Sequence, residues 1–399
     1  MLTTLAVEGY RSLRDVVLPL GSLTAVTGPN GSGKSNLYRA LRLLAEASRN
    51  GAVAALAREG GLPSTLWAGP EKVSPRMLSG EDPVQGTRRT GPVSLRLGFA
   101  SDDFGYALDL GLPVPGLAPP GRRTSAFDLD PEIKRETTWS GPMARPAAML
   151  TDRRGAVVRV RDDQGAWQVS GHRLQPFDSM LSELSDPANA PEVLALRERI
   201  RSWRFYDHFR TDPDAPARRP SIGTRTPVLG HDGSDLAAAW QTILEVGDRE
   251  TLHEVLDLAF PGSTVEIRTH EGVFSLALRQ PGMLRPLSAA ELSDGTLRFL
   301  LLLTALLTPR PPELMVVNEP ESSLHPDLLP ALGRLVVATS ARTQVVVVTH
   351  SAPLLAALAA AGEQGGRELT ATVLRKDLGQ TAVEGQTRFG RPAWSWPSR

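Results

Sequence analysis

Residues 28–35 read Gly-Pro-Asn-Gly-Ser-Gly-Lys-Ser, which fits the pattern G-x-x-x-x-G-K-[ST]. Its glycines let backbone N–H groups converge on phosphate oxygens, and the helix that follows directs its positive end toward them. In such a loop Lys34 reaches the β- and γ-phosphates, and Ser35 offers its hydroxyl to Mg²⁺. The apolar run Leu23–Thr27 precedes the pattern and helically spaced leucines follow it, which is the context that a phosphate loop requires.

A second candidate lies where the apolar run Leu314–Val317 ends in Asn318, Glu319 and Glu321. A strand that delivers a carboxylate beside Mg²⁺ can orient the water that attacks a phosphate. We expect Glu319 to carry that role, and the alternative is a strand end with solvated acids. Asn318 would face the metal, where a neutral amide is a poorer Mg²⁺ ligand than a carboxylate.

Two further polar groups follow predicted elements. Ser293 and the N–H of Gly295 stand at the start of an apolar helix and could bind an anion there, although Ser-Asp-Gly is also an ordinary helix cap. His350 follows the buried-type strand Val345–Val348, whose carboxyl edge would meet a γ-phosphate. A structural histidine is the alternative at that position.

The order of these motifs resembles ATP-binding-cassette (ABC) ATPases, specifically the RecF/SMC/OLD-like branch. The start of the chain, Val7–Leu13, is similar to the N-terminal strand motif of that branch. Specific motifs of the resemblance cover Leu2–Leu44 and Ser288–Leu358. Trp203–Phe209 and Gly230–Leu236 are similar to bacterial predicted ATPases of the AAA type that lack a coiled coil.

The resemblance implies ATP and Mg²⁺ as ligands. It places the phosphate-loop residues at the phosphates and the metal, namely Gly28, Asn30, Gly31, Ser32, Gly33, Lys34, Ser35 and Asn36. Ser35 and Asn318 would hold the metal, and Arg11 would lie near the nucleotide. Glu319 would polarise the attacking water and His350 would contact the γ-phosphate.

The resemblance also implies a homodimer. Ser293 and Gly295 would complete the site of a second subunit, so two chains would enclose two ATP molecules, with Ser322–His325 as the D-loop between them. Three features depart from the family pattern. The Walker B aspartate is Asn318, the signature reads LSDGT, and only Gln85 offers itself as a weak glutamine-loop residue.

Composition sets limits on function. Among 399 residues, 44 Lys and Arg balance 44 Asp and Glu, which excludes nucleic-acid binding through overall positive charge but leaves a local basic patch open. The absence of cysteine excludes disulfides, thiol catalysis and cysteine-ligated metals. No apolar stretch has the length of a signal peptide or a membrane helix. We therefore expect a cytoplasmic protein without membrane contact, with nucleoid association as a second option.

The expected fold is an α/β P-loop NTPase, an ABC-type head with a mainly parallel core sheet, a lateral antiparallel β-sheet and a helical lobe. Residues 1–170 would hold the phosphate loop and a β-meander from about residue 92 onward. Residues 171–262 would form the mainly helical lobe. Residues 263–399 would hold the signature, the Walker B strand and the histidine. We expect 112–123, rich in proline and glycine, to be an exposed loop.

Three functions compete. The first is an ATPase whose nucleotide-driven dimerisation serves DNA repair, recombination or chromosome maintenance, with Arg197, Arg201 and Arg204 as a phosphate-binding face; a solvated helix face is the alternative for these arginines. The second is the ATPase subunit of an antiphage or toxin module that acts through a protein effector. The third is a nucleotide switch with little turnover, which Asn318 supports. A transporter ATPase is the least favoured.

Overall fold

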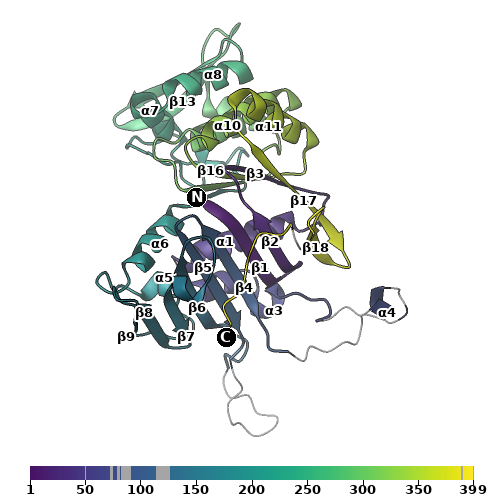
Figure 1. Ribbon diagram of the computed structural model, residues 1–399. Helices are drawn as coiled ribbons and strands as arrows, with labels where there is room; N and C mark the ends of the chain where they lie inside the picture. Colours follow the sequence, from purple (N-terminus) through teal and green to yellow (C-terminus); the bar gives the residue numbers. More distant parts are fainter. Residues whose placement is uncertain are drawn as a thin grey trace. The chain divides into compact units, whose positions relative to one another are not determined.

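The computed structural model describes residues 1–49, 51–71, 75–78, 81, 91–113, 126–387 and 390–398. Gln85 and most of the predicted loop 112–123 lie outside the described residues. The chain groups into two compact units (Figure 1). Unit 1 comprises residues 1–20, 28–202 and 372–399, and unit 2 comprises residues 21–27 and 203–371.

The main element of unit 1 is an antiparallel sheet. Its described strands are β1 (Leu2–Tyr10), β2 (Leu13–Pro19), β4 (Leu95–Ser101), β5 (Phe104–Gly111), β6 (Glu132–Ser140), β7 (Met149–Arg154), β8 (Val157–Arg161) and β9 (Trp167–Arg173). They follow the order β2-β1-β4-β5-β6-β7-β8-β9, and each neighbouring pair is antiparallel. The predicted β-meander is therefore present and joins the N-terminal hairpin in one sheet.

Helix α1 (Lys34–Ala47) contacts β1 and β4 of this sheet. Its buried stripe contains Leu37, Leu41 and Leu44, which recur at helical spacing and explain why this segment folds as an amphipathic helix. The other described helices of unit 1 are α2 (Ala52–Arg58), α3 (Gly61–Thr65), α4 (Pro75–Leu78), α5 (Met180–Glu183) and α6 (Pro191–Ser202). The chain passes from unit 2 into unit 1 within β17 (Leu369–Asp377), which forms an antiparallel hairpin with β18 (Gln380–Val383).

Unit 2 is built on parallel strands. Its strands β10 (Arg204–Tyr206), β15 (Leu314–Asn318), β16 (Gln344–Val348) and β3 (Leu23–Thr27) lie in that order, and all three neighbouring pairs are parallel. Every residue of β16 is buried, as the run of valines predicts for a parallel strand covered on both faces. The carboxyl ends of these strands consequently meet at one edge.

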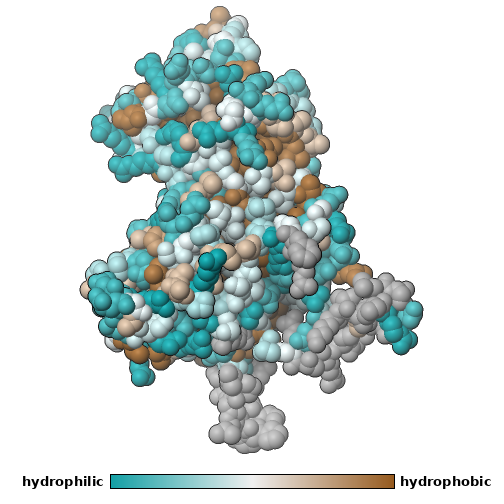
Figure 2. All heavy atoms as spheres, viewed as in Figure 1, coloured by the Kyte–Doolittle hydropathy of each residue, from teal (hydrophilic) through white to brown (hydrophobic). Residues whose placement is uncertain are grey.

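The rest of unit 2 covers these strands and adds a small antiparallel sheet. The helices are α7 (Leu236–Val246), α8 (Arg249–Ala259), α9 (Asp294–Leu306), α10 (Leu329–Ser340) and α11 (Ala352–Gly365), and the strands are β11 (Ser221–Ile222), β12 (Thr264–His270), β13 (Val273–Arg279) and β14 (Leu287–Ser288). Trp240 and Phe299 lie in the core that α7 and α9 share. Figure 2 shows hydrophobic residues on the visible face over α10 and α11, where Ala356, Ala359 and Ala360 of α11 are exposed.

The two units divide the chain differently from the expected parts 1–170, 171–262 and 263–399. Helices α5 and α6 of the expected helical lobe belong to unit 1, whereas α7 and α8 belong to unit 2. The cause is β10, which the sequence analysis did not predict and which pairs with β15 directly after α6. The three-part division stays a prediction. The structure and the family reported below confirm the mixed α/β P-loop fold class.

Candidate functional site

The phosphate loop of unit 1 has the backbone that its glycines predict. It follows Thr27, the last residue of β3, directly in the chain, and Gly33 caps α1 with φ of 109°. Gly28 and Gly31 also have positive φ values, 145° and 79°. Residues with a side chain rarely adopt such values, so the loop depends on glycine at these places. Lys34 Nζ donates to the carbonyl oxygens of Gly28 and Pro29 at 2.6 and 3.1 Å, which holds the ammonium over the loop.

Two side chains outside the motif support the loop from behind. Thr381 Oγ1, on β18, donates to the Ser32 carbonyl oxygen at 2.7 Å and lies 2.8 Å from Ser12 Oγ. Ser12 Oγ in turn accepts a hydrogen bond from Asn36 Nδ2 at 2.8 Å. A Cβ on Gly33 would lie 2.0 Å from Thr381 Oγ1, so only glycine fits against this support. The first turn of α1 is therefore tied to β18 and to the β1–β2 turn.

The remaining predicted loop residues differ in exposure. Asn30, Gly31 and Ser35 are exposed, as groups that must reach a ligand would be. Ser32 is fully buried, and its hydroxyl has no hydrogen-bond partner in the described part of the chain. Arg11 has a positive φ of 48° and pairs with Glu59 at 3.0 Å. Its place near a nucleotide stays a prediction.

In unit 2, the ends of three adjacent strands bring polar residues to one edge. Asn318 ends β15, Asp207 follows β10, and Thr349 and His350 follow β16. The register places Tyr206 beside Val317. The residues that follow these two, Asp207 and Asn318, therefore lie next to each other. Asn318 Nδ2 donates to Asp207 Oδ1 at 2.7 Å. The amide at the Walker B position is thus paired with a carboxylate from the neighbouring strand.

Glu319, Glu321 and His350 form one cluster at this edge. His350 Nδ1 lies 3.4 Å from Glu319 Oε1 and 3.6 Å from Glu321 Oε1. Thr349 Oγ1 donates to Glu321 Oε1, and the Glu319 N–H donates to the Val348 carbonyl oxygen at 2.7 Å. Glu319 has φ of 46°, which is uncommon for a residue with a side chain and points to a functional constraint at this turn. The structure therefore brings together the two residues predicted to be catalytic.

Arg298, on the helix α9 that the signature opens, reaches the same cluster. Its side chain is 2% exposed, and Nη2 donates to the Glu319 carbonyl oxygen at 3.1 Å while Nη1 lies 3.3 Å from His208 Nδ1. Burial lowers the pKa of Arg298, and the carboxylates of Glu321, Asp207 and Glu319 oppose that effect. A guanidinium stays charged even so, since its ordinary pKa lies far above neutral pH. A fixed positive charge therefore interacts with the carboxylates of Glu321, Asp207 and Glu319.

The donor set suits Mg²⁺, which prefers oxygen ligands and usually keeps several waters beside one or two carboxylates and substrate phosphates. Asp207, Glu319 and Glu321 supply carboxylate oxygens. Glu321 Oε2 is buried and lacks a hydrogen-bond partner among the described residues, as expected of an atom that a bound water or cation would satisfy. Within those residues, no three acidic or histidine side chains form a metal cage by themselves. The residues therefore fit a Mg²⁺ that phosphates and water also hold.

The signature residues lie at the N-terminus of α9. Ser293 caps this helix by accepting from the Thr296 N–H at 3.2 Å, which is the ordinary cap that the sequence left open as the alternative. A Cβ on Gly295 would lie 2.8 Å from the Ser323 carbonyl oxygen, so the signature packs closely on the predicted D-loop. Both segments line an open hollow of about 570 Å³ on unit 2. The structure brings the signature and the D-loop to one surface.

The proposed phosphate-binding face of arginines is wrong for Arg197. Arg197 is buried, and its guanidinium donates to the carbonyl oxygens of Leu184 and Met180, because the arginine side of α6 packs against α5. Arg201 donates to the Ser48 carbonyl oxygen at 2.9 Å. Arg204 lies on β10 and belongs to unit 2. The contacts of Arg197 and Arg201 support the fold of unit 1.

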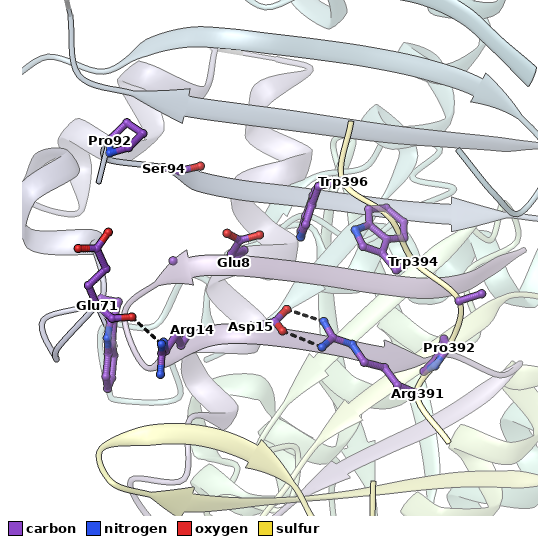
Figure 3. A pocket seen from close by; sticks show the side chains of 13 residues that line it. Glu8, Arg14, Asp15, Glu71, Pro92, Ser94, Arg391, Pro392, Trp394 and Trp396 are labelled. Atoms are coloured by element: carbon purple, nitrogen blue, oxygen red, sulfur yellow. Dashed lines mark hydrogen bonds and ion pairs between the residues drawn. The ribbon is translucent and has the colours of Figure 1, made fainter. Parts of the chain in front are cut away.

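A hollow of about 720 Å³ lies in unit 1 beside β1 and β2 (Figure 3). Arg391 donates to both carboxylate oxygens of Asp15, at 2.7 and 2.5 Å, and Arg14 donates to the Glu71 carbonyl oxygen at 2.6 Å. Burial raises the pKa of Glu8 in the same wall. Both arginines that line this hollow are held by protein oxygens, which makes it a weak candidate for an anionic ligand.

Sequence reasoning missed Asp207, Arg298, Ser12 and Thr381. Asp207 has a signal, a carboxylate directly after a short aromatic run, but the three-residue strand before it was not recognised. Thr381 lies 349 residues after Ser32, and no local pattern connects the two. Among the described residues, no helix combines the length and the apolar character needed to cross a membrane.

Comparisons with known proteins give the family of this chain. A family model described as "AAA domain, putative AbiEii toxin, Type IV TA system" matches residues 23–357. The OLD nuclease of Thermus scotoductus is 52% identical over 44 residues, which are 11% of this chain and 8% of that protein. The chain thus matches less than a tenth of that relative's length.

Solved structures of low sequence identity also match along most of the chain. The SMC head domain from Thermotoga maritima has a TM-score of 0.42 at 17% identity. The match covers 96% of this chain and 97% of the SMC head chain. An SmcHead bound to the C-winged helix domain of ScpA has a TM-score of 0.49 at 13% identity, with coverage of 96% and 97%. Because the family model spans residues 23–357 of 399, this chain belongs to that AAA-domain family.

Proposed function

We propose that this protein binds ATP with Mg²⁺ and hydrolyses it. The observation that carries the proposal is the phosphate loop of unit 1, with its left-handed glycines, the N-terminus of α1 and the ammonium of Lys34 held over the loop. Backbone N–H groups and a helix N-terminus are ready-made donors for phosphate oxygens. Lys34 would offset triphosphate charge, and the exposed hydroxyl of Ser35 would bind the metal.

Unit 2 would supply the hydrolytic groups. Glu319 would orient the attacking water or accept its proton. His350, whose Nδ1 lies 3.4 Å from Glu319 Oε1, would contact the γ-phosphate. Asn318 would face the Mg²⁺. The fixed turn at Glu319, held by Arg298 and by the Val348 carbonyl oxygen, would keep the carboxylate in one orientation. Positioning of this kind is the main protein contribution to phosphoryl transfer.

ATP would also drive dimerisation. In this proposal Ser293 and Gly295 of one subunit bind the ATP of the other, and the D-loop packed beside Gly295 runs along the interface. The open hollow that both segments line on unit 2 is the supporting observation. ATP would then act as part of the contact between two copies of this chain.

The coupled process has two candidates. Coupling to DNA repair, recombination or chromosome maintenance rests on the resemblance to the RecF/SMC/OLD-like branch, although the arginine face offered for it is buried in part. The printed family description, with its toxin and type IV TA system, favours a second candidate, an ATPase that acts through a protein effector in an antiphage or toxin module.

One experiment tests the activity and separates these candidates. We would measure ATPase rates of the full chain with Mg²⁺, alone and with single- or double-stranded DNA, beside the Glu319→Gln variant. A wild-type rate above that of the variant supports hydrolysis, and stimulation by DNA supports the first coupling. A wild-type rate equal to that of Glu319→Gln would overturn hydrolysis and leave the low-turnover switch as the better account.

A further inference from the structure

We propose that Asp207 supplies the carboxylate at Mg²⁺ that the Walker B position, Asn318, lacks. This inference rests on the proposed function, because it concerns the metal of that same site. It assigns a metal-directed role to a residue to which the sequence analysis gave no role of its own. The negative charge that Asn318 of β15 lacks would be supplied by Asp207, which follows the neighbouring strand β10.

The register of the parallel strands carries the first step. Phe205 and Tyr206 pair with Val316 and Val317, so Asp207 emerges from β10 at the level where Asn318 emerges from β15. A carboxylate at either position therefore reaches the same edge. Tyr206 is buried, which fixes the end of β10, whereas Asp207 itself is exposed and accessible to a ligand.

The hydrogen bond between the two side chains carries the second step. Asn318 donates through Nδ2, so its own amide oxygen stays available as an acceptor, and Asp207 uses Oδ1. Asp207 Oδ2 has no hydrogen-bond donor among the described residues. The pair thus offers an amide oxygen and a carboxylate oxygen with one net negative charge. A single aspartate would offer the same charge and two oxygens to Mg²⁺ or to its bound water.

Glu321 provides an independent observation at the same edge. Its side chain is 9% exposed, Oε1 accepts from Thr349, and Oε2 is buried without a partner among the described residues. Burying an unpaired carboxylate oxygen is costly unless a water or cation satisfies it. Arg298 donates to the Glu319 carbonyl oxygen at 3.1 Å, and its guanidinium interacts electrostatically with Glu321, Asp207 and Glu319. This arrangement favours a bound cation or its water shell over a mere strand end.

Nucleotide binding as a function of free Mg²⁺ tests the inference without relying on turnover. We would titrate Mg²⁺ into the EDTA-treated full chain with a fluorescent ATP analogue and record the Mg²⁺ concentration at half-maximal enhancement of affinity. Asp207→Asn removes the charge but keeps an oxygen that can accept from Asn318. We expect it to raise that Mg²⁺ concentration about tenfold, since losing one charge-assisted contact is worth about 1.5 kcal/mol or more, with nucleotide affinity in EDTA unchanged.

An exchange variant is the sharpest control. The double variant with Asp207→Asn and Asn318→Asp returns the carboxylate to β15 and reverses the hydrogen bond, so we expect a Mg²⁺ requirement close to that of the wild type. Asp214→Asn removes another exposed aspartate of unit 2 and should change nothing. If Asp207→Asn fails to fold, Asp207→Ser, which is smaller and also uncharged, should still raise the requirement.

The outcomes separate the inference from the proposed function. An unchanged Mg²⁺ requirement in Asp207→Asn, or a raised one that the exchange does not restore, would overturn the role of Asp207 while leaving ATP binding intact. Weaker nucleotide binding by Asp207→Asn in EDTA would also overturn it, because the residue would then act on the nucleotide. Absence of Mg²⁺-dependent nucleotide binding by the wild type would overturn the proposed function, and the inference with it.

Discussion

At the scale of the residue, Lys34 makes the most direct prediction. It is the lysine of the phosphate loop, and its Nζ already lies 2.6 Å from the Gly28 carbonyl oxygen. Charge-assisted contacts to phosphate are worth about 1.5–3 kcal/mol each, so Lys34→Ala should weaken ATP binding about a hundredfold or more. Isothermal titration with ATP and Mg²⁺ would measure this. Lys134→Ala, which removes a lysine paired with Glu132 on β6, is the matched control, and equal affinity in the two variants would remove Lys34 from the site.

A second prediction concerns Asn318→Asp, whose effect on stability depends on the negative charge of the neighbouring Asp207. Asn318→Asp would place a carboxylate within hydrogen-bond distance of Asp207, where two like charges repel and share a proton. We expect a lower Tm in EDTA at pH 7, a deficit that shrinks as the pH falls and one carboxylate takes up a proton. Mg²⁺ with ATP should close the deficit, and a lower Mg²⁺ concentration should support half-maximal ATPase.

Thermal melts with and without Mg²⁺–ATP, at several pH values, would check this pair of effects. A Tm of Asn318→Asp that does not depend on Mg²⁺–ATP, together with an unchanged Mg²⁺ requirement, would remove residue 318 from the metal site. If wild-type turnover does not exceed that of Glu319→Gln and Asn318→Asp creates turnover, the amide marks a site that had lost hydrolysis.

At the scale of the element, the support of the phosphate loop by β18 is testable. Thr381 bonds both the loop and Ser12, and Thr381→Val keeps the shape of the side chain while removing these hydrogen bonds. Leaving their partners unsatisfied should cost about 1–3 kcal/mol of unfolding free energy. We expect ATP affinity to fall about tenfold as the loop loses its fixed position. Denaturant unfolding and ATP titration would measure the two effects.

Thr137→Val is the matched control for that experiment. Thr137 is a buried threonine of β6 whose hydroxyl has no hydrogen-bond partner in the described part of the chain. Its replacement should leave both stability and ATP affinity close to those of the wild type. Equal ATP affinity in Thr381→Val and Thr137→Val would show that β18 does not position the loop.

The same elements show what the sequence could predict. The phosphate loop, α1 and β16 follow from local patterns, since glycine spacing, helical periodicity and a run of valines each carry their own signal within a few residues. β10 carries almost none, because three residues of strand have too little pattern to separate from a loop. Asp207 was missed with it. Arg197 was placed on a surface because periodicity locates a stripe on a helix without showing which neighbour covers it.

At the scale of the whole molecule, the prediction is an ATP-dependent dimer. Glu319→Gln keeps the shape of the side chain but lowers its capacity to orient and deprotonate water, so hydrolysis should slow at least a hundredfold while ATP still binds. ATP would then persist in the site and hold two chains together. Light scattering of Glu319→Gln with Mg²⁺–ATP should report a mass near twice the 42.9 kDa of one chain. With ADP in place of ATP, the mass should be that of a single chain. A monomeric mass at every concentration tried would contradict the shared-site model.

Ser293 then separates the interface from the nucleotide site. Ser293→Arg places a bulky cation on the exposed cap of α9, where the second subunit's ATP would bind, so it should abolish the dimer in a Glu319→Gln background. Nucleotide affinity of each monomer should remain nearly unchanged, because Lys34 and the phosphate loop belong to unit 1. The substitution also removes a helix cap worth about 1 kcal/mol. Ser293→Ala loses the same cap without the bulk, so a dimer that survives in Ser293→Ala but not in Ser293→Arg would assign the effect to the bulk at the interface. Loss in both would assign it to the Ser293 hydroxyl, which serves as helix cap and as the proposed contact to ATP.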